Sequence, residues 1–177
     1  MDTTRRDFLT GTATVVGAAA TGNVVHADDN VHQEVPGQRQ ADHHSRSRTM
    51  PLVRIDLIRG KSAEYRKTVG EIVYNAMRDL INVPKDDKFQ IITEHAPEDL
   101  NFAKSCLGNT YSRGIIFIQI TLNAGRSVEM KKAFYKRIAD ELNAQLQVRR
   151  EDVWINLVEV AKENWSFGGG IAQYATP

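Results

Sequence analysis

The sequence contains a single cysteine, Cys106, among its 177 residues. One thiol excludes an internal disulfide, and no Cys/His cluster surrounds Cys106 that would indicate a metal site. We expect Cys106 to be a half-buried small hydrophobic residue. The fold is therefore expected to need no disulfide.

The sequence also lacks a surplus of charge of either sign. Its 23 basic residues are matched by 22 acidic residues, and residues 50–177 contain no long run of like charge. A surplus of positive charge is what attracts nucleic acids and anionic membranes. No nucleic-acid partner is therefore expected.

A long apolar run is absent as well. The apolar stretch that ends at Val25 is short and rich in glycine and threonine, so it is a poor membrane span, and no stable membrane insertion is expected. Residues 1–27 instead resemble a twin-arginine-type signal peptide, with Arg5 and Arg6 before the apolar stretch and small-residue cleavage signals up to Ala27. This pattern predicts export to the periplasm or the cell exterior. The alternative is a chance basic pair on a disordered tail.

Residues 28–49 are polar and charged and show no apolar period. This composition predicts a disordered linker. Its histidines, His32, His43 and His44, are irregularly spaced, so we interpret them as solvated side chains rather than metal ligands. The remaining residues, 50–177, are numerous enough to bury a core and form the one predicted domain.

Residues 50–177 contain an internal repeat with a constant offset of 65 positions. The matched pairs include Ile55 and Ile120, Gly60 and Gly125, Ser62 and Ser127, Glu64 and Glu129, Asp87 and Asp152, and Glu94 and Glu159. In each half, alternating apolar residues predict a strand, and a Gly-x-Ser turn then predicts the start of a helix with serine as N-cap. Each half ends in a second predicted strand, at residues 88–95 and 153–160.

Two such β-α-β units predict an α/β (α+β) fold. Right-handed crossovers place both helices on one face of a four-stranded sheet. The helices have apolar stripes that are expected to form the core. The opposite face would carry Arg54, Gln119 and Thr121, a mixture suited to burial against another subunit, so an oligomer is expected.

Three segments carry a resemblance to a known family: residues 50–55, which begin Met50-Pro51, residues 91–95, and residues 165–170. With the repeat, they resemble the tautomerase superfamily, and in particular the fused 4-oxalocrotonate tautomerase group near malonate semialdehyde decarboxylase. The resemblance covers residues 50 to about 174. It implies a homotrimer, no cofactor, a small carbonyl acid as substrate, and an amino-terminal proline as general base or acid.

Two residues match catalytic positions of that family. Pro51 matches the catalytic proline, whose amine would have a pKa that burial lowers toward the range useful for proton transfer. The alternative role for Pro51 is to begin a strand. Asp87 matches an acidic residue that resembles a water activator or proton partner, and the alternative is a turn aspartate, as its repeat counterpart Asp152 suggests.

Three residues match positions that bind or enclose the substrate. Arg126, beside a helix start, resembles the family's carboxylate-binding arginine, although it would also serve as a basic surface residue. The decarboxylase pattern has a second arginine two positions earlier, where this chain has Ala124. Trp165 and Phe167 are expected to form an apolar wall around the proline, or an arm that packs on a neighbouring subunit.

The sequence leaves two hypotheses of different classes. The first is a cofactor-independent tautomerase that acts on a small 2-oxo acid or dicarbonyl, with a decarboxylase or hydratase as a related possibility. The second is an exported, non-catalytic oligomeric module. Cleavage after Ala27 leaves 23 residues before Pro51, so the proline nitrogen would be an amide. Translation from Met50 would instead give a free amine and a cytoplasmic protein.

Overall fold

The computed structural model describes residues 50–175. The elements are β1 (Leu52–Ile58), α1 (Ala63–Leu80), β2 (Gln90–His95), β3 (Ser105–Cys106), β4 (Asn109–Thr110), β5 (Ile116–Asn123), α2 (Val128–Leu146) and β6 (Val153–Val160), with short 3₁₀ helices at Arg150–Asp152 and Lys162–Asn164. The predicted signal peptide (1–27) and linker (28–49) lie outside the described residues and stay predictions.

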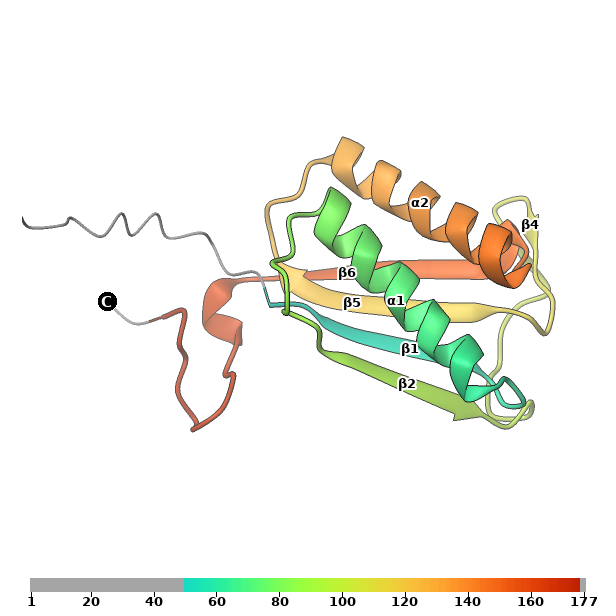
Figure 1. Ribbon diagram of the computed structural model, residues 1–177, viewed down its shortest axis with the longest axis horizontal. Helices are drawn as coiled ribbons and strands as arrows, with labels where there is room; N and C mark the ends of the chain where they lie inside the picture. Colours follow the sequence, from blue (N-terminus) through green and yellow to red (C-terminus); the bar gives the residue numbers. More distant parts are fainter. Residues whose placement is uncertain (1–49, 176–177) are drawn as a thin grey trace, which may run out of the picture. The chain divides into compact units, whose positions relative to one another are not determined.

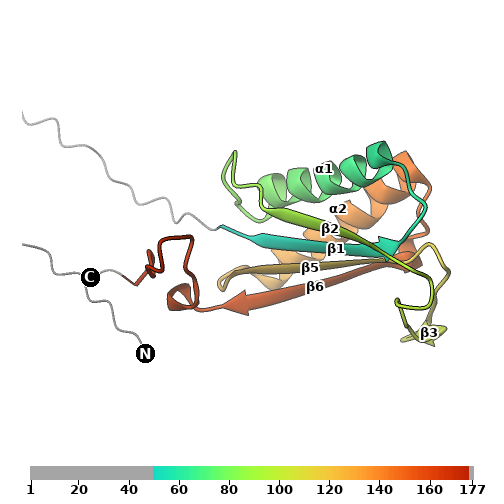
Figure 2. The same ribbon diagram turned by 90° about the horizontal axis from the view of Figure 1, so that it is seen from below.

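The four long strands form one sheet in the order β2-β1-β5-β6. The strands of each β-α-β unit are parallel, whereas β1 and β5, which join the two units, are antiparallel, with Leu52 opposite Thr121. Both helices cover the same face of the sheet (Figures 1 and 2). The predicted fold class is therefore confirmed.

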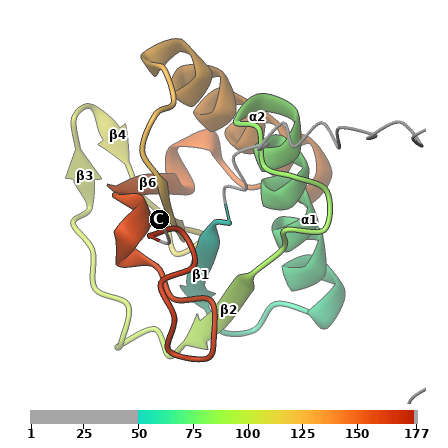
Figure 3. The ribbon, with the colours of Figure 1, turned by 90° about the vertical axis from the view of Figure 1, so that its left-hand side faces the viewer.

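This topology gathers four chain segments at one end of the sheet. β1 and β2 begin there, and β5 and β6 end there. Figure 3 looks onto this end, with the carboxyl-terminal segment after β6 in front of it. Residues that precede β1 and β2 and residues that follow β5 and β6 are thus brought to one place, although the sequence separates them widely.

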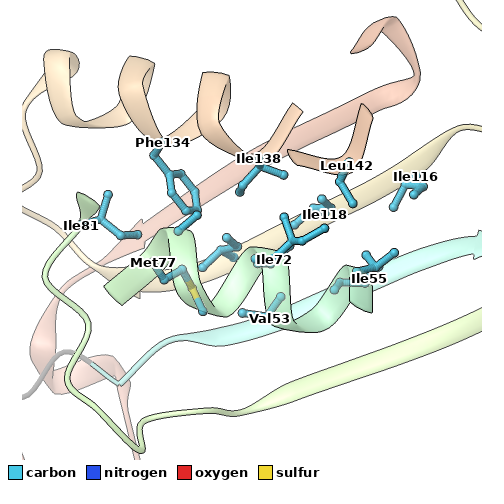
Figure 4. Packing of buried hydrophobic residues seen from close by; sticks show 14 of the residues in the cluster. Val53, Ile55, Ile72, Met77, Ile81, Ile116, Ile118, Phe134, Ile138 and Leu142 are labelled. Carbon is cyan, nitrogen blue, oxygen red and sulfur yellow. The ribbon is translucent and has the colours of Figure 1, made fainter. Parts of the chain in front are cut away.

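The core lies between the sheet and the two helices (Figure 4). Alternate residues of β1 and β5 are fully buried on the helix-covered face, as the strand periodicity predicted. Helix α2 contributes Phe134, Ile138 and Leu142, each 0 % exposed, and α1 contributes Val69, Val73 and Met77. Burial of these side chains is the main stabilising contribution to the fold.

The two repeats match in backbone conformation as well as in sequence. Gly60 and Gly125, 65 positions apart, have φ angles of 112° and 125°, which a glycine adopts without strain. Both serines cap their helices as predicted. The hydroxyl oxygen of Ser62 accepts from the Tyr65 N–H at 3.0 Å, and that of Ser127 accepts from the Met130 N–H at 3.2 Å.

Replacing the N-cap of α2 gives a test of this assignment. We expect Ser127→Ala to lower the free energy of unfolding by about 1 kcal/mol, since the Met130 N–H loses its acceptor. Urea unfolding of the chain measures this change. Ser105→Ala, on exposed strand β3, is the matched control and should leave the midpoint nearly unchanged. An equal effect of the two substitutions would contradict the capping role.

Several boundaries differ from the predictions. Strand β1 begins at Leu52, one residue after Pro51, and β2 begins at Gln90 rather than at position 88. Helix α1 ends at Leu80, before Pro84 is reached, and Asn82 then takes a left-handed conformation with φ of 58°.

The expectation for Cys106 was wrong, because its side chain is exposed. Cys106 lies in a hairpin of β3 and β4 that the sequence analysis did not predict. The hairpin turn uses Leu107 and Gly108, with φ angles of 48° and 85°, and all residues of both strands are exposed. Each strand has two residues, too few to show an alternation of apolar and polar side chains. Figure 2 shows the hairpin at β3, away from the helices.

The face of the sheet opposite the helices has mixed polarity, as predicted. Arg54 and Gln119 are exposed, and Thr121 is half-buried. Large apolar side chains also lie on this face: Ile91 is 42 % exposed and Trp154 is 44 % exposed. Within residues 50–175, no helix is long and apolar enough to cross a membrane.

Candidate functional site

A pocket of about 270 Å³ lies at the end of the sheet where β1 begins. Its lining residues are Met50, Pro51, Leu52, Phe89, Trp165, Ser166 and Phe167. Pro51 is buried, immediately before β1. The lining is mostly apolar, and its volume suits a small organic molecule.

Aromatic rings from the carboxyl-terminal segment form one wall of this pocket. The rings of Trp165 and Phe167 stack with centroids 5.3 Å apart and an interplanar angle of 14°. The Tyr174 ring meets Phe167 edge-on, with centroids 5.0 Å apart. Offset stacked and edge-on rings attract one another beyond the area that they bury. The wall is thus a cluster of rings rather than two independent side chains.

The backbone after Phe167 turns through three consecutive glycines. Gly168, Gly169 and Gly170 have φ angles of 127°, 66° and 69°, a conformation that favours glycine. The side chain of Gln173 closes the loop, because its Oε1 accepts from the Phe167 N–H and its Nε2 donates to the Gly168 carbonyl, both at 2.9 Å. The three glycines therefore allow the tight turn that follows Phe167 in the aromatic wall.

Arg126 lies at the same end of the sheet, in the turn between β5 and α2. Its guanidinium is partly buried, where Nε donates to the Ile81 carbonyl at 3.3 Å and Nη1 donates to the Asn123 carbonyl. Burial lowers the pKa of Arg126, and the negative charge of Glu159 opposes that shift. The side chain is held at the junction of α1, β5 and α2.

Buried polar atoms without partners occur beside this guanidinium. Among residues 50–175, the Nη2 atom of Arg126 and both polar side-chain atoms of Asn123 are buried without a hydrogen-bond partner. Asn123 is only 3 % exposed. Leaving a buried donor unsatisfied costs about 1–3 kcal/mol, and more for a charged group. A bound water, ion or ligand would supply the missing partners.

Asp87 occupies the turn before β2. It is half-buried, and its backbone N–H donates to the Pro84 carbonyl at 3.3 Å. Its repeat counterpart, Asp152, is 1 % exposed and accepts from the backbone N–H and the hydroxyl of Ser112 at 2.7 and 2.6 Å. Asp152 therefore has a structural role, and the two readings of Asp87, proton partner or turn residue, stay open.

The structure brings Pro51, Trp165 and Phe167 together in one pocket. Arg126 and Asp87 lie at the same end of the sheet but do not line the pocket. The catalytic and binding roles of all five residues stay predictions. In the described part of the chain, no group of three or more His, Cys, Asp or Glu side chains is arranged to hold a metal ion.

Sequence reasoning missed Phe89, which lines the pocket and is 48 % exposed. The Val53 N–H donates to the Phe89 carbonyl at 2.9 Å, which ties Phe89 to the start of β1. The repeat offered a signal, because Phe89 corresponds to Trp154, which is also a large aromatic side chain with substantial exposure. Two large aromatic residues at matched positions, each at or just before the start of a strand, are the signal in the sequence that an apolar surface is exposed there.

Comparison with known proteins places this architecture. Two family models, both described as "Tautomerase enzyme", match residues 51–105 and 87–168. The probable tautomerase YusQ of Bacillus subtilis (strain 168) is 37 % identical over 124 residues, which are 70 % of this chain and 98 % of YusQ. The chain belongs to the tautomerase family. The probable tautomerase YrdN of the same organism is 30 % identical over 127 residues, 72 % of this chain and 98 % of YrdN.

Solved structures of the tautomerase fold agree with this assignment. A malonate semialdehyde decarboxylase inhibited by 3-bromopropiolate superposes with a TM-score of 0.63 and 36 % identity, over 71 % of this chain and 99 % of that one. A fused 4-oxalocrotonate tautomerase described as an asymmetric trimer gives a TM-score of 0.57 at 19 % identity, over 69 % of this chain and 96 % of that one. At 19 % identity, the similarity to the fused tautomerase shows a shared fold alone.

Proposed function

We propose that this tautomerase-family chain moves a proton between carbon and oxygen of a small 2-oxo acid or dicarbonyl, without a cofactor, once Pro51 is its amino terminus. The observation that carries the proposal is the burial of Pro51 in an apolar pocket of about 270 Å³ walled by Trp165 and Phe167. A substrate of a few carbon atoms fits such a volume.

The chemistry depends on the proline nitrogen. As the first residue, Pro51 carries a secondary amine that takes and returns a proton, whereas inside a longer chain its nitrogen is an amide without useful basicity. An apolar pocket disfavours the protonated amine and so lowers its pKa, which makes the free base available near neutral pH. We assign Asp87 as the assisting proton partner.

Arg126 is proposed to bind the substrate carboxylate. A carboxylate would accept from the Nη2 atom that now has no partner, and a charge-assisted hydrogen bond of this kind is stronger than a neutral one. Ala124 supplies no second guanidinium, so proton transfer is favoured over decarboxylation or hydration, which stay the alternative suggested by the similarity to malonate semialdehyde decarboxylase.

The location of the start of the mature chain decides between enzyme and module. A signal peptidase cut after Ala27 leaves Pro51 in an amide, and the chain would then be an exported, non-catalytic oligomer. Translation from Met50 followed by removal of that methionine, or a second cut before Pro51, frees the amine. We propose the free amine, and location in the cytoplasm follows from the first of these routes.

The oligomer is proposed to be a homotrimer that buries the face of the sheet opposite the helices. Support comes from the exposed Ile91 and Trp154 on that face, and from the trimer described for a fused relative of the same fold. Analytical ultracentrifugation of residues 50–177 is expected to give three times the chain mass. A monomer at micromolar concentration would contradict the trimer without affecting the proposed chemistry.

Two measurements test the proposed function. Intact mass and amino-terminal sequencing of the natively made protein are expected to show a chain that begins at Pro51, and a chain that begins at Asp28 would exclude proton transfer by the proline. In parallel, the chain translated from Met50, with that methionine removed, is assayed with the enol of phenylpyruvate, the enol form of a small 2-oxo acid. Full activity of the Pro51→Ala variant made in the same way would count against the proposed base.

A further inference from the structure

The turn before each helix is held by a glutamate from the second strand of the same repeat. In the first repeat, Glu94 on β2 accepts from the backbone N–H groups of Gly60 and Lys61 at 3.1 and 3.2 Å. The same carboxylate pairs with the Arg66 guanidinium at 2.6 Å. Through these three donors, Glu94 connects strand β2 to the Gly60-Lys61 turn and to the start of helix α1.

The second repeat has a related arrangement around Glu159 on β6, with the ion pair to the following helix retained. The Lys131 ammonium donates to Glu159 Oε2 at 2.8 Å, and the backbone N–H groups of Gly125 and Arg126 lie close enough to the same carboxylate to lower its pKa. Lys131 is also the repeat counterpart of Arg66. The pKa of Glu159 lies below its usual value. The main cause is the hydrogen bond from Lys131, and the backbone N–H groups of Gly125 and Arg126 contribute as well.

The two turns differ in the side chain that they present. The Lys61 ammonium lies 4.9 Å from the centroid of the Tyr65 ring, and Lys61 is exposed. The Arg126 side chain instead folds back and donates to Ile81 and Asn123. The turns lie at opposite ends of the sheet, and only the turn before α2 is at the Pro51 end (Figure 1).

We infer that Glu159 is a positioning residue for Arg126: it steadies the turn from which the guanidinium would bind a substrate carboxylate at the Pro51 end of the sheet. The inference rests on the proposed function for the role of Arg126. An arginine side chain loses considerable rotamer freedom when it is fixed, so a rigid backbone at its base reduces the freedom that ligand binding must remove. Glu159 does not line the pocket and is not proposed to contact the substrate.

The repeat provides a matched control for the test. Glu159→Ala and Glu94→Ala remove carboxylates at matched positions, each paired with a basic side chain of the helix in its own repeat, but only the first lies beside the turn that carries Arg126. Amide hydrogen exchange by NMR, in the chain that begins at Pro51, gives a readout independent of activity. We expect exchange at Gly125 and Arg126 to accelerate on the order of 10-fold in Glu159→Ala only, since both amides lose the carboxylate beside them and the turn loses its tie to Lys131.

Steady-state kinetics with the enol of phenylpyruvate give the second readout. In Glu159→Ala, KM is expected to rise on the order of 10-fold while kcat changes less than about 2-fold, because a looser Arg126 weakens binding without touching the proton transfer. Glu94→Ala should leave both constants unchanged. Glu159→Gln keeps an acceptor for the backbone and should restore part of the loss in KM.

Equal kinetic effects of Glu94→Ala and Glu159→Ala, or a looser turn with an unchanged KM, would overturn the inference and leave the proposed function intact. If the chain that begins at Pro51 has no activity, the proposed function fails, and the Nε–H resonance of Arg126 then decides the inference. Broadening of that resonance in Glu159→Ala alone supports positioning by Glu159. An unchanged resonance overturns it.

Discussion

A chain that begins at Pro51 is expected to be about 10²- to 10⁴-fold more active in kcat/KM than one that begins at Asp28, because only the first has an amine for general acid and base catalysis. The assay follows the decay of the enol of phenylpyruvate by its ultraviolet absorbance. The rate of the shorter chain should fall as pH is lowered below the pKa of the amine, since the protonated amine is no longer a base.

Two further chains separate the amine from other effects of length. A chain that keeps Met50 ahead of Pro51 is as short as the active one but has an amide at the proline, so it should be as inactive as the chain from Asp28. Pro51→Ala, begun at the same position, keeps a free but primary amine and should lose most of the activity. Equal activity in the chains that begin at Pro51 and at Asp28 would reject the amine as the base.

The second large effect is expected for Arg126→Gln, which should lower kcat/KM about 10- to 100-fold on a 2-oxo acid, in line with about 1.5–3 kcal/mol for a hydrogen bond to a charged group. An enolisable dicarbonyl without a carboxylate should be affected much less. The guanidinium also donates to Ile81 and Asn123, so the variant is expected to lose some stability as well, which urea unfolding measures.

The repeat again offers a control, because Lys61 is the counterpart of Arg126 at the other end of the sheet. Lys61→Gln should leave kcat/KM unchanged on both substrates. Arg126→Lys keeps the charge but loses the planar fork, so it should fall between the wild type and the glutamine variant. If Arg126→Gln affects the acid and the neutral dicarbonyl equally, the arginine does not act through the carboxylate.

Much of the fold could be predicted because each signal was local and occurred twice. Strand alternation, the Gly-x-Ser turn and the serine caps recur 65 positions apart, and a short-range pattern that is repeated is far more specific than a single occurrence. The β3-β4 hairpin had no such support, since it lies in the connection between the repeats and each strand has two residues. The expected half-burial of Cys106 was wrong for the same reason.

The candidate site was harder to predict, because its parts come from both repeats and from the segment after them. Family resemblance pointed to Pro51, Trp165 and Phe167, which the structure places around one pocket. Phe89 was missed because pairing between β1 and β2 brings it there, across a long separation in sequence. The side-chain amide of Asn123 is buried without hydrogen-bond partners because of packing at the end of the sheet, and no pattern in the sequence indicates this.

The antiparallel joining of β1 and β5 has a consequence for site stoichiometry. The repeat counterpart of Pro51 is Ile116, an internal residue whose nitrogen is always an amide. A polypeptide has a single amino terminus, so a fused pair of β-α-β units provides two similar helix-start turns but at most one proline amine. An assembly of three such chains would therefore hold three proline amines among six turns, and a reagent that reacts with the proline amine but not with lysine would label one repeat of each pair.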